Sequence, residues 1–372
     1  MSPGRRFELD DYESYGRPKR RSRPRTKLRP RYDDASRGVV VTIDRGRYTC
    51  RLISPMTRRG DGAAADEGAD TSHGYQRAAP SCGDGGASGP GDEGTLVVAV
   101  RARPLGRKSV VVGDRVRLVG DVSGKPGTLA RIVEIEERET VLRRTADDTD
   151  PVERVIVANA DQLVIVASLA DPPPRPRLID RCLVAAYDAG LDPLLCLTKA
   201  DLAAPDELLA TYRPLGVPSV VTRYDQDLAA QLRDRLVNRV SVLVGHSGVG
   251  KSTLVNALVP GAQRATAEVS EATGRGRHTS TQVVMLPLPF GGSIIDTPGI
   301  RSFGLAHVDA DGLIAAFPDL EAETEECPRG CTHGRTEPEC ALDVAISEGR
   351  VDPARVDSYR RLLDSRERRA GD

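Results

Sequence analysis

The chain has 372 residues, with 53 Lys and Arg against 54 Asp and Glu, so its net charge is only −1. That length is enough for two or three domains. No apolar run approaches the roughly 18 residues of a membrane span, and the N-terminus lacks the apolar core of a secretory signal. We therefore expect a cytoplasmic protein without a membrane segment.

The small net charge hides a basic segment near the N-terminus. From Arg17 to Arg31 there are nine Lys or Arg and no acidic residue, and the prolines in this run disfavour a helix. We interpret residues 1–36 as a disordered basic arm. One hypothesis is a salt-sensitive contact with the phosphate backbone of a nucleic acid. The alternative is a solvated tail without a partner.

Short alternating strands with glycine-containing turns come after the arm. They are predicted as a hairpin over 39–53 and as strands at 96–100, 114–119 and 129–135. Residues 56–94, rich in Gly, Ala and Asp, are expected to be a flexible insertion. We predict that 37–150 form a small closed β-barrel of the oligonucleotide-binding (OB) kind. Together with the basic arm it favours RNA contact, and the alternative is a barrel that acts as a spacer.

Beyond residue 155 the pattern changes to fully apolar strands that alternate with helices. Strands are predicted at 162–168, 194–197, 219–222 and 240–244, with helices at 179–189 and 227–237. Buried strands that alternate with helices are typical of a parallel α/β sheet. We expect this α/β domain to span 151–306, and residues 307–372 to be mostly helical.

A glycine-rich loop follows the strand at 240–244 and has the spacing of a phosphate-binding P-loop. Backbone N–H groups of such a loop converge on phosphate oxygens, and the N-terminus of the next helix adds positive potential. Lys251 is predicted to reach the β- and γ-phosphates, and Ser252 to ligate Mg²⁺. The predicted nucleotide-binding residues of the loop are Gly245, His246, Ser247, Gly248, Val249, Gly250, Lys251, Ser252 and Thr253.

The motif Asp296-Thr297-Pro298-Gly299 follows another apolar strand. The Asp296 carboxylate is predicted to hold Mg²⁺, directly or through water, and the Gly299 N–H to contact the γ-phosphate. Ile300 occupies the position at which many GTPases carry a Gln that orients the attacking water, and its side chain cannot do so.

A third motif, Thr198-Lys199-Ala200-Asp201, is predicted to bind guanine. The Asp201 carboxylate can accept two hydrogen bonds from the guanine N1–H and N2–H donors, a pair that adenine lacks. Lys199 is expected to pack its stem on the base, and the Thr198 hydroxyl to join neighbouring loops, although Asn is the usual first residue. The alternative is an ordinary turn at a strand end.

These motifs come in an unusual order. The guanine motif precedes the P-loop, whereas in an ordinary GTPase it follows both the P-loop and the Asp-x-x-Gly element. A sheet of strand–loop–helix units tolerates this order, because the site needs loops that are adjacent in space and not in sequence. The order predicts a circularly permuted GTPase domain.

A segment between the P-loop helix and Asp296, Gly276-Arg277-His278-Thr279-Ser280-Thr281, lies where the first switch loop is expected. His278 is our candidate catalytic residue, orienting the attacking water in place of the missing Gln. Thr279, Ser280 or Thr281 is expected to bind Mg²⁺ in the GTP state. The alternative for His278 is an exposed or RNA-contacting side chain.

Three cysteines and one histidine are clustered within 14 residues near the C-terminus, as Cys327, Cys331, His333 and Cys340. Three sulfur ligands and one nitrogen suit a four-coordinate structural Zn²⁺ without an open position for catalysis. An odd number of cysteines, seven in all, does not favour a disulfide framework. The alternative is a group of free or redox-active thiols.

Together these motifs resemble the ribosome small-subunit-dependent GTPases, a circularly permuted family of bacterial assembly factors. The resemblance covers about 37–366 and includes a switch segment similar to the family's Gly-x-His-Thr-Thr-Thr, here Gly276 to Thr281. It implies a monomer that binds the small ribosomal subunit and its rRNA, hydrolyses GTP to GDP under stimulation by the subunit, assists late maturation and leaves after hydrolysis.

Two other functions fit parts of the sequence. One is a permuted GTPase that acts on the large subunit, which the barrel before the GTPase domain and the cysteine cluster after it disfavour by family analogy. The other is an RNA chaperone with a regulatory nucleotide site. Ile300 is compatible with this function, because it replaces the Gln that orients the attacking water in many GTPases.

Overall fold

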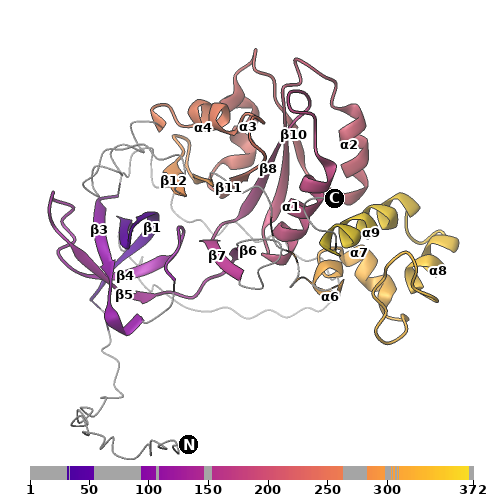
Figure 1. Cartoon of the computed structure of the whole chain (residues 1–372), viewed down its shortest axis with the longest axis horizontal. Helices are drawn as coiled ribbons and strands as arrows, with labels where there is room; N and C mark the ends of the chain where they lie inside the picture. Colours follow the sequence, from indigo (N-terminus) through magenta and orange to yellow (C-terminus); the bar gives the residue numbers. More distant parts are fainter. Residues whose placement is uncertain are drawn as a thin grey trace, which may run out of the picture. The chain divides into compact units, whose positions relative to one another are not determined.

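The computed structural model describes residues 32, 34–53, 94–105, 109–145, 153–262, 283–297, 303, 305, 308 and 310–367 (Figure 1). The predicted basic arm, apart from residues 32 and 34–36, lies outside the described residues. The predicted insertion at 56–94 lies outside them too, apart from residue 94. Among the helices in these ranges, none is long and apolar enough to cross a membrane.

Five strands form the predicted N-terminal barrel. They are β1 (Ser36–Asp44), β2 (Arg47–Leu52), β3 (Leu96–Arg101), β4 (Arg115–Gly120) and β5 (Ala130–Ile135), with a 3-10 helix at Arg103–Leu105. The sheet closes because β1 pairs with both β2 and β4, while β5 joins β3 to β4. Alternate residues such as Val116 and Leu118 point into the core, as the period of two requires.

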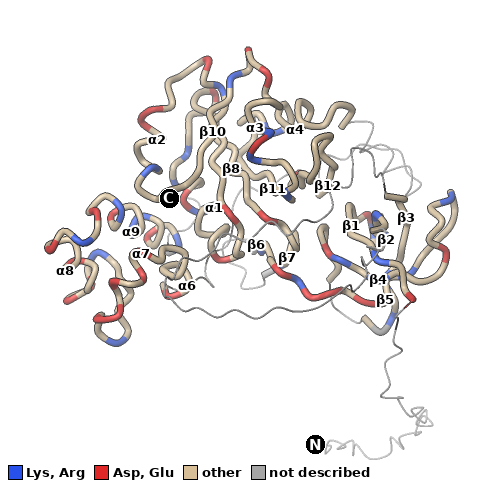
Figure 2. Tube along the Cα trace, turned by 180° about the vertical axis from the view of Figure 1, so that it is seen from behind, with Lys and Arg blue, Asp and Glu red and all other residues tan. Residues whose placement is uncertain are grey.

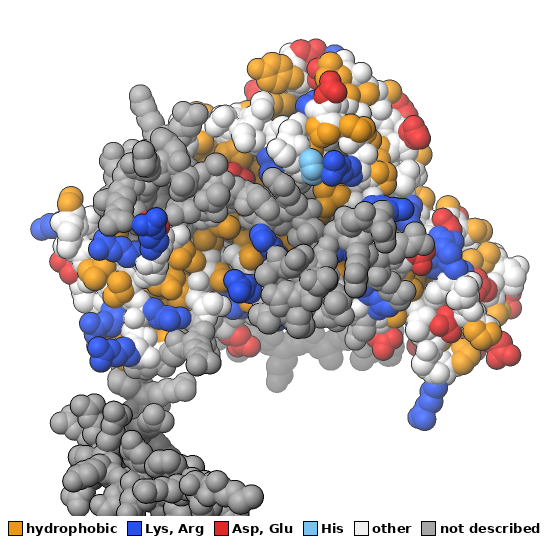
Figure 3. Space-filling view, viewed as in Figure 1, with side chains coloured by type: hydrophobic (Ala, Val, Ile, Leu, Met, Phe, Trp, Pro, Cys, Tyr) orange, Lys and Arg blue, Asp and Glu red, His pale blue; other side chains and the backbone are white. Residues whose placement is uncertain are grey.

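The outer surface of the barrel is rich in arginine, and part of that charge is neutralised by glutamates. Figure 3 shows Lys and Arg side chains over this part of the molecule, and Figure 2 shows acidic residues in the segment that follows β5. Arg37 donates to Glu136 at 2.7 and 2.9 Å, and Arg115 donates to Glu139 at 2.5 Å. These exposed pairs each contribute at most about 1 kcal/mol.

A separate hairpin follows the barrel. Strands β6 (Val141–Thr145) and β7 (Glu153–Ala158) pair antiparallel, on the two sides of the boundary expected at residue 150. The sequence pattern did not predict this hairpin. The domain limits 37–150, 151–306 and 307–372 remain a proposal.

The predicted α/β domain is built on a largely parallel sheet. Its strands are β8 (Gln162–Ser168), β9 (Asp192–Thr198), β10 (Ser219–Val221), β11 (Val240–Val244), β12 (Val284–Pro287) and β13 (Ser293–Asp296). In space the order is β10-β9-β8-β11-β13-β12, and among these strands only β12 runs antiparallel to its neighbour β13. On its other side β12 pairs antiparallel with β1 of the barrel, at Thr42 and Val284. Its helices are α1 (Pro176–Asp188), α2 (Asp206–Tyr212), α3 (Leu228–Leu236) and α4 (Lys251–Leu258), with a 3-10 helix at Arg213–Leu215.

Helices cover both faces of this sheet, so its central strand β8 is buried along its whole length (Figure 1). Odd-numbered residues of β8, such as Leu163 and Ile165, belong to the hydrophobic cluster that includes α1. Even-numbered residues, such as Val164 and Val166, belong to the cluster that includes α3 and α4. This arrangement explains why β8 is a continuous apolar run and not an alternating pattern.

Helix α1 begins three residues earlier than the expected 179, at Pro176. Proline is tolerated at the first position of a helix, because the N–H that it lacks has no partner inside the helix there.

The C-terminal part is helical, as predicted. It contains α6 (Ala310–Ile314), α7 (Pro318–Glu321), a 3-10 helix at Ala322–Thr324, α8 (Ala341–Ser347) and α9 (Pro353–Glu367). Phe317 stacks edge-to-face between Tyr187 of α1 and Tyr359 of α9, with ring centroids 5.1 and 5.6 Å away. Arg361 of α9 forms a 3.2 Å ion pair with Asp180 of α1. Aromatic packing and a buried ion pair thus attach the C-terminal helices to α1.

Candidate functional site

The sheet brings the predicted nucleotide motifs to one edge. Strands β8, β9, β11 and β13 are parallel, so their carboxyl ends and the loops that follow lie at the same edge. Asp296 ends β13, Gly245 follows β11, and Thr198 ends β9. The Thr198 loop comes first in the sequence. In the sheet it follows β9, which is separated from the P-loop strand β11 by the single strand β8. The permuted order therefore still assembles one site.

The P-loop backbone has positive φ at three glycines, Gly245, Gly248 and Gly250. Gly245 has φ +154°, and a Cβ atom there would lie 2.3 Å from the carbonyl oxygen of Val166 in β8. Gly250, with φ +96°, precedes helix α4 in the left-handed region. Only glycine adopts these conformations readily. A tight turn followed by the N-terminus of α4 is the geometry that binds a phosphate group.

Lys251 and Asp296 form the charged centre of the site. The Lys251 ammonium donates to the carbonyl oxygens of Gly245 and His246, the latter at 3.2 Å. Burial lowers the pKa of Lys251, and the nearby Asp296 carboxylate opposes that shift. Burial likewise raises the pKa of Asp296 against the opposing effect of Lys251. A half-buried carboxylate facing an ammonium suits a divalent cation and phosphate.

Thr198 connects the predicted guanine motif to the P-loop. Its buried hydroxyl donates to the carbonyl oxygen of Val249 in the P-loop at 2.7 Å and lies 3.4 Å from that of Ala167. A hydroxyl is shorter than the usual Asn amide, but here it makes the connection expected from the sequence.

The remainder of the predicted guanine motif is more exposed. Asp201 lies at the surface, and its carboxylate accepts a hydrogen bond from the backbone N–H of Tyr224 at 3.4 Å. Ala200 N–H donates to the carbonyl oxygen of Thr222, which joins the loops after β9 and β10. The Lys199 ammonium contacts the carbonyl oxygen of Asp171. The Tyr224 contact carries no sequence signal, because it is made by a backbone group.

The structure describes only part of the predicted catalytic set. The hydroxyl-bearing residues Ser252 and Thr253 are exposed at the first turn of α4. His278, Thr279, Thr281 and Gly299 lie outside the described residues, so their predicted roles remain predictions.

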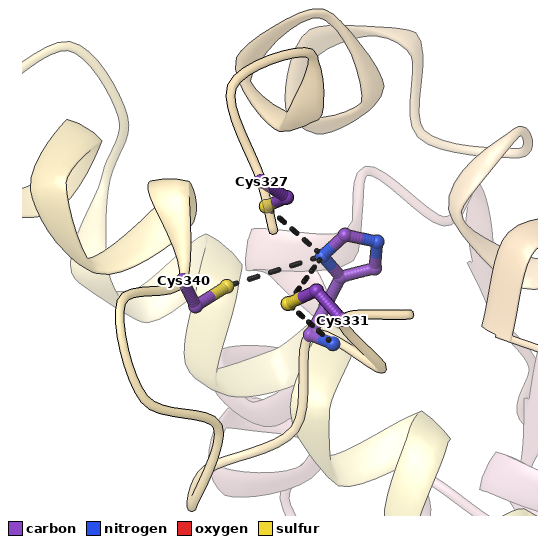
Figure 4. A group of neighbouring side chains, drawn as sticks. Cys327, Cys331 and Cys340 are labelled. Atoms are coloured by element: carbon purple, nitrogen blue, oxygen red, sulfur yellow. Dashed lines mark hydrogen bonds between the residues drawn. The ribbon is translucent and has the colours of Figure 1, made fainter. Parts of the chain in front are cut away.

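The four predicted metal ligands come together (Figure 4). The His333 Nδ1 atom lies 3.5 Å from the Cys327 sulfur, 3.6 Å from Cys331 and 3.9 Å from Cys340, and all four donor atoms lie within 4.8 Å of one another. A tetrahedral ion with Zn–S of about 2.3 Å and Zn–N of about 2.0 Å would separate S and N by about 3.5 Å. The donor set and its spacing fit such an ion.

Backbone and charged groups hold this cluster in place. The N–H of Ala341 donates to the Cys327 sulfur at 3.3 Å, and that of His333 to the Cys331 sulfur at 3.4 Å. Arg360 of α9 donates to the carbonyl oxygen of His333 and pairs with Asp343 of α8 at 2.7 and 2.9 Å. Burial raises the pKa of Cys331 to about 12, so a cation is the partner that thiolates here require.

Sequence reasoning missed the residues that link the P-loop domain to its C-terminal helices. Arg181 of α1 donates to the carbonyl oxygens of Phe303 and Ser365, at 2.5 and 3.3 Å. Asp180 pairs with Arg361, 181 positions away. Such distant partners leave no local pattern. The sequence contains one indication: Asp180 and Arg181 are charged residues within an otherwise apolar stretch of α1, and buried charges require partners.

The fold and the site define a class: a circularly permuted P-loop GTPase domain between a small β-barrel and a helical domain with a metal-ligand cluster. Residues 135–306 match the family described as RsgA GTPase. The chain is 41% identical over 269 residues to the small ribosomal subunit biogenesis GTPase RsgA of Chlorobaculum parvum, covering 70% of this chain and 86% of that one. The chain belongs to the RsgA GTPase family.

A second relative carries the same description, and two solved structures share the fold. The RsgA of Ectopseudomonas mendocina is 47% identical over 218 residues, 56% of this chain and 63% of the relative, so less than two thirds of that protein is matched. YjeQ from Thermotoga maritima has a TM-score of 0.59 at 23% identity, covering 90% of this chain and 99% of that one. YloQ, described as a circularly permuted GTPase, has the same score and identity, with 91% and 98% covered. These two structures support the fold alone.

Proposed function

We propose that this protein hydrolyses GTP while bound to the small ribosomal subunit, and that it assists the late maturation of that subunit. The observation that carries the proposal is the meeting of the Thr198, Gly245 and Asp296 loops at one edge of the sheet, with Thr198 bonded to the P-loop. The small ribosomal subunit named for the relatives supports the choice of partner. Assembly of ribosomal subunits implies work in the cytoplasm.

Each motif has a role in this proposal. Asp201 accepts hydrogen bonds from guanine, the P-loop binds the phosphates through its N–H groups, and Lys251 neutralises their charge. Ser252 and Asp296 would hold Mg²⁺, since both offer the oxygen ligands that this ion prefers. Bound Mg²⁺ supplies neutralisation of charge on the phosphate oxygens. His278 would orient the attacking water, Gly299 would contact the γ-phosphate, and Thr279 or Thr281 would complete the magnesium ligands; all four lie outside the described residues.

The cluster of Cys327, Cys331, His333 and Cys340 is proposed to bind one structural Zn²⁺ per chain. All four donors are used by a tetrahedral ion, which leaves no position for a substrate. Such an ion would hold the turn before α8 against α9, where Arg360 contacts both the cluster and Asp343.

GTP binding and hydrolysis are proposed to change the affinity of the protein for the small ribosomal subunit. GTP with Mg²⁺ orders the loop around 270–281 and favours the bound state, whereas hydrolysis relaxes it and releases a monomeric protein. A lower subunit affinity with GTP than with GDP would contradict this model.

The test is phosphate release from GTP, with ATP as control, in the presence and absence of purified small subunits. Strong stimulation with GTP alone supports the proposal. If purified large subunits stimulated GTP turnover as strongly as small subunits do, the small subunit would not be the specific partner. Equal turnover of ATP would show that Asp201 does not select guanine. Lys251→Ala should abolish turnover, whereas an RNA chaperone with a regulatory site would keep its annealing activity in this variant.

A further inference from the structure

Tyr224 is unusually exposed for an aromatic residue. Its exposed fraction is 75%, the largest among the exposed bulky hydrophobic side chains of the described residues, and Leu202 comes second at 59%. The remaining four of these side chains are between 37% and 47% exposed. Single exposed apolar residues are common, but the two largest exposures here occur in neighbouring loops at one site.

Both residues flank the carboxylate that is proposed to bind guanine. Leu202 is the next residue after Asp201 in the chain, and the Tyr224 backbone N–H donates to the Asp201 carboxylate at 3.4 Å. This bond orients one carboxylate oxygen, and lone pairs remain for further donors. The edge of a purine bound to Asp201 would therefore lie beside the Tyr224 backbone.

The turn that carries Tyr224 is fixed by its own hydrogen bonds. Thr222 before it donates through both N–H and hydroxyl to the carbonyl oxygen of Leu197, at 2.7 and 3.1 Å. The Arg223 N–H donates to Gln231 of α3 at 3.3 Å, and Asp227 caps α3 by accepting from Ala229 and Ala230. The Tyr224 backbone is thus held in place.

The charged neighbours of Tyr224 are already paired with each other. The Arg223 guanidinium donates to both carboxylate oxygens of Asp225 at 3.0 Å. This pairing removes the adjacent charges as partners for the base. The aromatic ring is then the group at this turn suited to the apolar face of a purine.

We propose that the Tyr224 ring stacks on the base of the bound guanine nucleotide, with Leu202 beside it. The inference rests on the proposed function and assigns a contact at the same site. Asp201 recognises the edge of the base, and Tyr224 covers a face of it. Stacking acts on any purine, so Tyr224 sets affinity while Asp201 sets the choice of guanine.

The experiment compares GDP affinity, by isothermal titration calorimetry, in the full chain and three variants. Tyr224→Ala is expected to raise the dissociation constant of GDP about 10-fold, the value for about 1.4 kcal/mol of stacking. Tyr224→Phe keeps the ring and should bind within about 2-fold of the unmodified chain. Val344→Ala, which truncates a 46% exposed residue of α8, is the matched control and should have no effect.

Tyrosine fluorescence gives a second measurement. The chain has no Trp, so its nine tyrosines provide the intrinsic emission. Saturating GDP should change this emission in the unmodified chain, and Tyr224→Phe should remove most of the change without weakening binding. A merely structural role for Tyr224 would not link the signal to this one ring.

Each outcome bears on a distinct claim. An unmodified chain that does not bind GDP would overturn the proposed function. If it binds GDP and Tyr224→Ala binds as tightly as Val344→Ala, the stacking contact is wrong while the proposed function stands. Equal losses in Tyr224→Phe and Tyr224→Ala would assign the contact to the hydroxyl group, and an unchanged emission response in Tyr224→Phe would also overturn stacking.

Discussion

The hydroxyl of Thr198 offers a sharp test of how the two halves of the site are joined. Thr198→Val keeps the shape of the side chain but removes the 2.7 Å hydrogen bond to the Val249 carbonyl oxygen. A buried polar group that loses its partner costs about 1 to 3 kcal/mol. We expect the free energy of unfolding to fall by about 1 to 2 kcal/mol. If the free energy of GDP binding falls by the same amount, the GDP dissociation constant would rise about 5- to 30-fold.

Thermal melting and calorimetry would measure the two effects separately. For a domain of this size each kcal/mol corresponds to a melting shift of about 2 to 4 °C. Ser241→Ala is the matched control, because the Ser241 hydroxyl accepts a buried 2.7 Å hydrogen bond from Gln162 at the opposite edge of the sheet. That variant should lose stability and keep its GDP affinity.

Thr198→Val would refute the reasoning if it melted like the unmodified chain and bound GDP equally well. Loss of stability with unchanged affinity would show that the hydrogen bond supports the fold without shaping the P-loop. Thr198→Ser, which retains the hydroxyl, should restore both properties.

Three further predictions concern the metal cluster, the buried ion pair and the magnesium ligand. Cys340→Ser removes a fully buried ligand and should reduce zinc, measured by native mass spectrometry, from one ion per chain to none; full zinc content would contradict the four-ligand site. Arg361→Ala leaves Asp180 buried without its partner and should lower the free energy of unfolding by about 3 kcal/mol. Burial raises the pKa of Asp180 and Arg361 opposes that shift, so removing Arg361 raises this pKa further. Because protonation removes the buried charge, the deficit should shrink as the pH is lowered, which urea unfolding at pH 5 and pH 8 would measure. Equal deficits at both values would count against this account, and Asp180→Asn in the same chain should recover part of the loss. Finally, burial raises the pKa of Asp296, so Mg²⁺-dependent GTP binding should weaken as the pH falls toward that pKa. Asp296→Asn should bind Mg²⁺–GTP weakly without this pH dependence, and a pH profile shared with the unmodified chain would exclude Asp296 as its cause.

Local patterns predicted the nucleotide loops because phosphate binding imposes a spacing on a short stretch of chain. Gly245, Gly250 and Lys251 are recognisable in sequence, since the turn admits little else. The Cys/His cluster is predictable for the same reason, because its four possible metal ligands lie within 14 residues of one another.

Elements set by distant partners were not predictable in this way. Strand β12 has four residues, ends in Pro287 and is defined by its pairing with β13 and with the distant strand β1. Helix α2 has seven residues, too few for a clear period. The Asp180–Arg361 pair joins two helices, and its residues are 181 positions apart in the chain. A local sequence pattern therefore cannot include both of them.

The strand order of the sheet has a consequence for synthesis on the ribosome. Strand β8 is made first and lies in the middle, with β9 and β10 added on one side and β11, β13 and β12 on the other. Strand β12 is made before β13 and lies outside it, so these two strands can join the sheet together, as an antiparallel hairpin beside β11. The loop with Asp201 is complete before Lys251 is translated, and Asp296 emerges last of the three. The growing chain therefore acquires the proposed base-binding loop before the proposed phosphate-binding loops, and the proposed site is complete only after β13 has been added.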